Sequence, residues 1–212
     1  MTNESDFKLK VGTTHLSVVS GSGGSTLGLQ IARELILKNK HVFWISQNMP
    51  DPTRFSQIFS NVPFSSSSKL HISEAGENTE FAILSTMNVV SAMSNVGAVI
   101  IDDWLPRAGK ASKKDVEPVS KLSSVCRDSD VSLLLISSAY ENVEGQSSNS
   151  NPDDENWGYR VRAKKLGDSF VDQIWWLNLA DKSNLRHLWI ENEKTELRLE
   201  NNGFTNNLNF EG

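Results

Sequence analysis

The stretch Val18-Val19-Ser20-Gly21-Ser22-Gly23-Gly24-Ser25 decides the fold, because a β-branched run leads into it and an amphipathic run follows it. Residues 15–20 predict a strand, and the apolar positions over residues 26–38 recur with helical spacing. A strand, a glycine-rich turn and a helix form the layout of a phosphate-binding loop, in which turn amides and the helix dipole attract an anion. The candidate anion-binding residues are Gly21, Ser22, Gly23, Gly24, Ser25 and Thr26.

The turn nevertheless departs from the nucleotide-binding pattern of glycine, four residues and then Gly-Lys-Ser/Thr. Gly23 and Ser25 fit that pattern, but Val18 stands at the first glycine and Gly24 stands at the lysine. The lysine neutralises the outer phosphates of a nucleotide, and glycine offers no substitute. We therefore expect no cofactor, with at most weak binding of ATP and Mg²⁺. The simpler interpretation is a tight turn that only feeds the helix.

Short apolar runs alternate with amphipathic stretches through the first two thirds of the chain. Strands are expected at residues 42–45, 70–72, 98–101 and 131–136, and helices after Asp51-Pro52 and over residues 79–93 and 116–127. The helix over residues 79–93 has Phe81, Leu84, Val89 and Met93 among its apolar positions. This alternation predicts an α/β fold, with a mainly parallel central sheet flanked by helices on both faces. Antiparallel C-terminal strands are expected at residues 172–179, 187–192 and 195–200.

The domain organisation follows from these runs. We expect one domain over residues 12–200, an N-terminal tail over residues 1–11 and a loose C-terminal tail over residues 201–212. Residues 141–155 are rich in Ser, Asn, Asp and Gly, so a long loop is expected over residues 141–165. Loops of that length are usually functional or disordered.

Composition limits the classes of function. The 212 residues carry a formal net charge of −5, so any contact with DNA requires a local basic patch. Cys126 is the single cysteine, which excludes an intramolecular disulfide and favours a reducing cytoplasm, or the nucleus in a eukaryote. The longest apolar runs are far too short to span a bilayer, so no membrane partner is expected.

The order of these features resembles the core domain of RecA-superfamily recombinases, especially archaeal RadA and RadB and the related KaiC-like proteins. The resemblance extends over about residues 12–192, and its fold is the RecA-like form of the P-loop NTPase fold. The stretches that carry it are residues 12–16, 27–32, 42–47, 99–102 and 166–174.

The resemblance also implies roles for single positions. Gln47 stands where the family has its catalytic glutamate, and a glutamine cannot act as a carboxylate base. Asp102 matches the aspartate that helps to hold magnesium, although a carboxylate that caps a turn is an equal alternative. Ala139 stands where the family has the glutamine that couples ATP to the DNA-binding loop. These departures argue against turnover and leave no predicted catalytic residue.

Two loops match the recombinase loops that line the DNA filament axis. Candidate DNA-binding residues in the first loop are Arg107, Lys110, Lys113 and Lys114. Those at the end of the second loop are Trp157, Tyr159, Arg160, Arg162, Lys164 and Lys165. Cations pair with phosphates and flat rings stack on bases, but the acidic residues 153–155 would repel a backbone. The alternatives are a solvated basic face or a segment that docks onto an acidic subunit.

The resemblance implies a non-catalytic recombinase paralogue, an accessory factor in homologous recombination or DNA repair. Its expected partners are single- or double-stranded DNA, a catalytic RecA-family recombinase or homologous subunits. One alternative is an atypical ATP-binding protein or ATPase of the RecA/KaiC family. Another is a structural subunit of a RecA-like ring assembly that does not act on DNA.

Overall fold

The computed structural model describes residues 9–76, 78–106, 110–141, 152, 157–180 and 182–206 of the chain. Its helices are α1 (Gly24–Leu37), α2 (Pro52–Phe59), α3 (Phe64–Ser67), α4 (Thr79–Ala92), α5 (Lys113–Asp128) and α6 (Lys164–Gly167). Its strands are β1 (Gly12–Val18), β2 (His41–Ser46), β3 (Leu70–Glu74), β4 (Val96–Asp102), β5 (Ser132–Ser138), β6 (Tyr140–Glu141), β7 (Tyr159–Arg160), β8 (Gln173–Leu179), β9 (Leu185–Ile190), β10 (Glu193–Glu200) and β11 (Gly203–Asn206).

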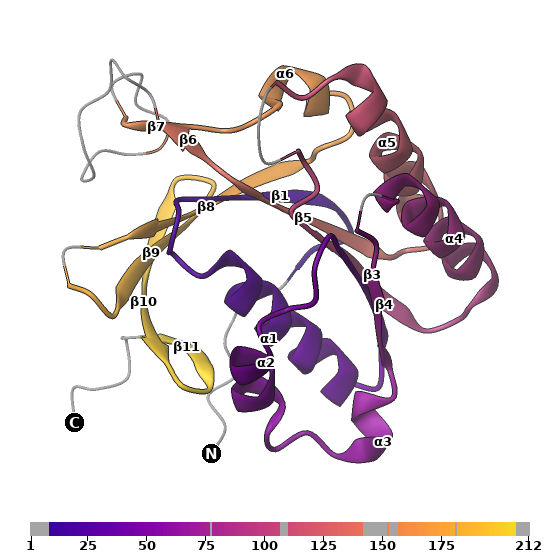
Figure 1. The fold of residues 1–212 in the computed structure, drawn as a ribbon, viewed down its shortest axis with the longest axis horizontal. Coiled ribbons are helices and arrows are strands. Elements are labelled where there is room, and N and C mark those ends of the chain that lie inside the picture. Colours follow the sequence, from indigo (N-terminus) through magenta and orange to yellow (C-terminus); the bar gives the residue numbers. More distant parts are fainter. Residues whose placement is uncertain are drawn as a thin grey trace.

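A nine-stranded sheet in the order β11-β10-β9-β8-β1-β5-β4-β2-β3 forms the centre of the fold. The pairs from β8 through β1, β5, β4 and β2 to β3 are parallel. The pairs β8–β9, β9–β10 and β10–β11 are antiparallel. Helices α1 and α2 cover one face, and α4 and α5 cover the other (Figure 1). The predicted α/β class, with its antiparallel C-terminal strands, is confirmed.

A hydrophobic core lies on each face of the sheet. On the α1 face, Leu27, Ile31 and Trp44 belong to one buried cluster, which also includes Trp175 of β8. On the α5 face, Leu122 and neighbouring apolar residues of β4 and β5 form a second cluster. Because the carboxyl ends of parallel strands lie along the same side of a sheet, the residues that follow β1, β2, β4 and β5 lie close together.

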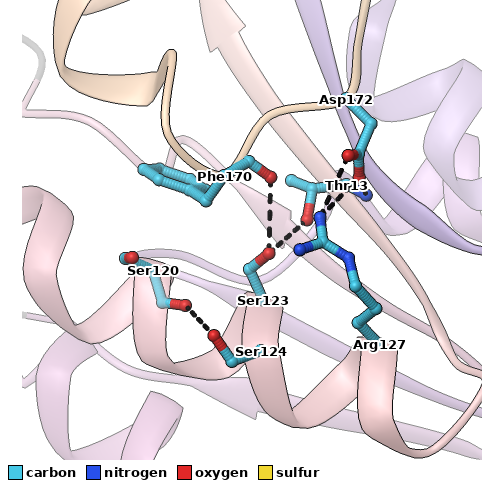
Figure 2. Close-up of polar contacts among 7 residues, drawn as sticks. All are labelled: Thr13, Ser120, Ser123, Ser124, Arg127, Phe170 and Asp172. Atoms are coloured by element: carbon cyan, nitrogen blue, oxygen red, sulfur yellow. Dashed lines mark hydrogen bonds and ion pairs between the residues drawn. The ribbon is translucent and has the colours of Figure 1, made fainter.

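A polar cluster joins α5, the start of β1 and the segment before β8 at the amino ends of the parallel strands (Figure 2). Arg127 of α5 donates from Nη2 to both carboxylate oxygens of Asp172, at 3.0 and 2.9 Å. The same carboxylate accepts the main-chain N–H of Thr13 at 2.7 Å. The Thr13 and Ser123 hydroxyls lie 2.7 Å apart. Helix α5 and the segment before β8 are thereby fixed to the start of β1.

Helix α4 forms where expected, but its buried face differs from the predicted apolar positions. Phe81, Leu84 and Val89 are 73%, 42% and 40% exposed, whereas Ala82, Ile83, Thr86 and Val90 are buried. Apolar residues occur on every side of this helix, so the periodicity of the sequence does not select the buried side. The buried side of α4 is instead formed by Ala82, Ile83, Thr86 and Val90.

The segment after Asn201 is not uniformly loose, because residues 203–206 form β11 at one edge of the sheet. Gln30 of α1 fixes this strand: its Nε2 donates to the Phe204 carbonyl at 2.9 Å, and its Oε1 accepts the Phe204 N–H at 2.7 Å. A contact across 174 residues leaves no local signal in the sequence.

The predicted loop over residues 141–165 also contains structure. Tyr159–Arg160 pairs with Tyr140–Glu141 as the ribbon β7–β6, and α6 begins at Lys164. Across the described ranges, no helix has both the length and the apolar character required to cross a bilayer.

Candidate functional site

A cavity of about 490 Å³ opens where the carboxyl ends of β1, β2, β4 and β5 meet, and we call it the turn cavity. Ser20, Gly21, Gly23 and Gly24 of the glycine turn form one wall together with Ser25 and Thr26 of α1. Gln47 and Asp102 line the cavity from the ends of β2 and β4. The structure thus brings the predicted anion-binding residues together, except that Ser22 is fully buried.

Backbone conformation explains why glycine occupies this turn. Gly21 and Gly23 have φ angles of 76° and 96°, in the left-handed region where a side chain is strained. The Ser22 N–H donates to the Val19 carbonyl at 3.0 Å and closes the turn. Gly23 is the N-cap of α1 and provides no side chain to cap the helix. The first N–H groups of α1 are therefore available to a ligand.

Packing explains why position 24 carries no side chain. A Cβ at Gly24 would lie 2.6 Å from Cγ2 of Val18 and 3.1 Å from Cγ2 of Ile136. Val18 is β-branched and stiff, so it cannot easily move aside. The departures at positions 18 and 24 therefore depend on each other, because Val18 occupies the space that any side chain at position 24 would need.

The charge of the lining opposes a polyphosphate. Among the described residues that line the turn cavity, Arg54 is the one cation, while Asp51, Asp102 and Asp103 are carboxylates. Arg54 donates from Nη1 to the carbonyls of Glu200 and Asn201, at 2.8 and 3.2 Å. The cavity therefore does not fit a nucleoside triphosphate and its magnesium ion in the arrangement that the motif describes.

A second hollow, of about 640 Å³, gathers residues from the two predicted DNA-binding loops. Lys110 of the first loop meets the basic residues of the second loop, and the exposed ring of Tyr140 lies with them. We call this set the basic surface: Lys110, Tyr140, Arg160, Arg162, Lys164 and Lys165. Apolar atoms of Val161 and Leu166 complete the lining. Such a hollow offers cations to phosphates and one ring to a base.

The turn cavity and the basic surface adjoin. A smaller hollow of about 270 Å³ is lined by Asp103, Leu105, Ser137, Ser138 and Arg162. Asp103 and Ser138 also line the turn cavity, and Arg162 belongs to the basic surface. Residues of the two candidate sites are therefore near neighbours at the ends of β4 and β5.

Comparison with known proteins gives a structural match but no sequence match. No protein-family model and no curated protein matches the sequence. The crystal structure of the RadB recombinase superposes with a TM-score of 0.69 and 18% identity, covering 92% of this chain and 90% of that one. The chain has the fold of the RadB recombinase. The expected RecA-like fold is thus confirmed, and at this identity the match shows the fold alone.

Within the RecA-like fold, the other predicted DNA-binding residues differ in their placement. Lys113 and Lys114 are exposed in the first turn of α5. Arg107 lies outside the described residues. Tyr159 is half-buried, with its ring centroid 5.5 Å from that of Trp157. Lys110 and the cations of the second loop therefore provide the basic surface.

The role predicted for Trp157 is wrong, because its indole is 1% exposed and cannot stack on a base. It meets Trp176 of β8 edge to face, with the ring centroids 4.3 Å apart. Burial of so large an apolar ring is more favourable in free energy than its exposure at the surface. Trp157 instead anchors the start of the basic segment to the sheet. Tyr140, which follows Ala139, provides the exposed ring of the basic surface and was not predicted as a binding residue.

A buried histidine supports the residues between the two hollows. Trp104 donates its indole N–H to His15 Nε2 at 3.3 Å, and the Ser137 hydroxyl lies 2.8 Å from the same nitrogen. Burial lowers the pKa of His15 to about 3, so the ring is neutral and its Nε2 accepts. The described part of the chain has no cluster of three or more His, Cys, Asp or Glu side chains that could hold a metal ion.

Proposed function

We propose that the chain is a non-hydrolysing RecA-like accessory factor in homologous recombination or DNA repair, which binds DNA through its basic surface. The observation that carries this proposal is the convergence of five cations and an exposed tyrosine on one hollow of an otherwise acidic protein. A local patch of this kind attracts a phosphate backbone despite the overall charge of −5. An exposed ring beside it favours unpaired bases.

The proposed absence of hydrolysis rests on the turn cavity. Position 24 has no room for a lysine, and Gln47 provides no carboxylate at the end of β2. Charge that develops on a transferred phosphoryl group would find no cation on the turn, and water would find no carboxylate at position 47. The proposal therefore assigns DNA binding to the chain without ATP turnover.

The test is binding of a labelled single-stranded oligonucleotide, and of its duplex, measured by fluorescence anisotropy at low salt. The variant changes three exposed cations of the basic surface to glutamine: Lys110, Lys164 and Lys165. Three lost phosphate contacts should weaken binding by about tenfold or more. The control changes Lys38, Lys40 and Lys194 to glutamine, because these lysines are also exposed and the change in net charge is identical.

Equal affinities of the variant and the control would contradict the assignment of the surface. No oligonucleotide binding at low salt by the unchanged chain would contradict DNA binding altogether. In that case, retention of a purified RecA-family recombinase on the immobilised chain would favour the protein partner over the nucleic acid.

One observation favours an atypical ATP-binding protein as the second candidate. Arg54 lines the turn cavity and presents a guanidinium at its mouth. This cation could replace the missing lysine if it left the carbonyls of Glu200 and Asn201. Saturable binding of Mg²⁺·ATP that is lost in Arg54→Gln would favour this candidate.

A further inference from the structure

Arg186 of β9 is a buried cation that reaches the glycine turn from within the sheet. Arg186 is only 6% exposed. Its Nε donates to the Ser22 carbonyl at 3.2 Å, and its Nη2 donates to the Gly21 carbonyl at 3.4 Å. Its Nη1 donates to the carbonyls of Ser183 and Leu185, both at 2.8 Å. The guanidinium thus joins the start of β9 to a turn 165 residues earlier.

The buried guanidinium of Arg186 depends on these four carbonyls as hydrogen-bond acceptors. Burial lowers the pKa of Arg186, because removing a charge from water is costly. Four main-chain carbonyl dipoles help to compensate the charge. A turn that moved away would leave buried guanidinium N–H groups without acceptors, and that loss opposes the movement.

The direction of these bonds determines what the turn presents to the cavity. The C=O and N–H of one trans peptide point in opposite directions. With the Ser22 carbonyl on Arg186, the N–H of Gly23 points away from β9, and Gly23 lines the turn cavity. On another side, the Phe204 ring of β11 lies 3.0 Å from the place of a Cβ at Gly23. The antiparallel strands therefore support the turn at two points.

We infer that Arg186 is a positioning residue for the glycine turn, which holds the turn in its cavity-forming shape without a bound ligand. The chain keeps the preformed cavity although the lysine position is occupied by glycine. This inference concerns the turn cavity alone and does not depend on the proposed binding of DNA.

The test is site-resolved amide hydrogen exchange by NMR of the unliganded chain, of Arg186→Met and of Arg186→Lys. In Arg186→Met, the hydrogen-bonded amides at the turn, Ser22 to the Val19 carbonyl and Leu27 to the Gly23 carbonyl, should exchange about tenfold faster or more, while those in the middle of β1 and β5 keep their protection. Arg186→Lys should restore part of the protection, since an ammonium still donates to carbonyls. The control is Arg198→Met, which removes a half-buried arginine from β10. Arg198 is one residue from Leu197, the partner of Arg186 in the sheet, and so faces the other side.

Three results would overturn the inference. The first is unchanged exchange at the turn in Arg186→Met, or in Arg186→Lys if the methionine variant does not fold. The second is a uniform loss of protection over β1, β8 and β9, which would mean that Arg186 serves general stability. The third is an equal loss of turn protection in Arg198→Met, which would mean that removing either arginine from the antiparallel strands loosens the turn.

Discussion

Val18 and Gly24 explain one another at the scale of single residues. Cγ2 of Val18 lies only 2.6 Å from the position that a Cβ at residue 24 would take. Any side chain at position 24 therefore overpacks the junction between β1 and α1 unless position 18 becomes smaller. The two positions are thus coupled, and a lysine at position 24 fits without overpacking only if position 18 changes as well.

The first prediction is that Gly24→Lys destabilises the fold by about 1–3 kcal/mol and produces no ATP turnover. The destabilisation comes from Val18, and the missing turnover follows from the absence of a carboxylate at Gln47. In a Val18→Gly background, the same substitution should cost less, which a double-mutant cycle on urea unfolding would measure. Additive free energies, or phosphate release by the single variant, would contradict this explanation.

The second prediction concerns His15, whose folded-state pKa of about 3 lies below the ordinary value of 6.5. The unfolded chain binds the proton more readily, so stability from this residue is complete above pH 6.5 and is lost as the pH falls toward 3. Between pH 8 and pH 5 this loss amounts to about 2 kcal/mol.

Urea unfolding of the wild type and of His15→Gln at the two pH values measures this term. The glutamine oxygen can still accept from Trp104, but it does not titrate. The variant should therefore lose about 2 kcal/mol less than the wild type on acidification. Equal losses in the two proteins would show that His15 protonates as easily in the folded state as in the unfolded chain.

At the scale of elements, local patterns predicted existence better than orientation. The N-cap Asp51 and Pro52 predicted the start of α2, and the Asp51 carboxylate does accept the Arg54 N–H at 2.7 Å. The buried side of α4, the strand β11 and the burial of Trp157 were not predicted. Each depends on a partner distant in sequence: the sheet under Ala82, Gln30 for β11, and Trp176 for Trp157.

The candidate sites divide in the same way. Gly23, Gln47 and Asp102 follow strands whose order fixes them at one edge of the sheet, so the turn cavity could be predicted. Arg186 could not, because an arginine in an apolar run has no motif and its acceptors are main-chain carbonyls. Long-range main-chain acceptors leave no mark on the sequence.

The third prediction tests the cluster that joins α5 and β8 to β1. Asp172→Ala removes the acceptor of both Arg127 and the Thr13 N–H, and should lower the free energy of unfolding by about 1–2 kcal/mol. This modest value reflects the half-exposed ion pair. Asp172→Asn should lose less, since its amide oxygen still accepts from Thr13. Urea unfolding measures both variants, and Asp168→Ala at an exposed position is the control. A control that falls as far as Asp172→Ala would refute the role of the cluster.

At the scale of the whole molecule, opposite charges are segregated between neighbouring sites. The turn cavity has three carboxylates and one described cation, while the basic surface has five cations. The two sites adjoin through the smaller hollow, which shares Asp103 and Ser138 with the turn cavity and Arg162 with the basic surface. However, Ala139 stands at the position that the RecA-family resemblance assigns to a coupling glutamine. A methyl group there provides no hydrogen bond by which a phosphate could alter the basic surface.

The final prediction is that oligonucleotide binding depends steeply on salt and does not respond to ATP. Neutralisation of phosphates by the five cations of the basic surface should give a log–log salt slope of about −3 to −4 for a single strand. Saturating Mg²⁺·ATP should leave the dissociation constant unchanged, because a ligand with equal affinity for two states shifts neither of them. Anisotropy titrations at several salt concentrations, with and without Mg²⁺·ATP, measure both quantities. A tenfold change in the dissociation constant on adding Mg²⁺·ATP would contradict this prediction. It would show that the turn cavity binds nucleotide and that this binding alters the basic surface.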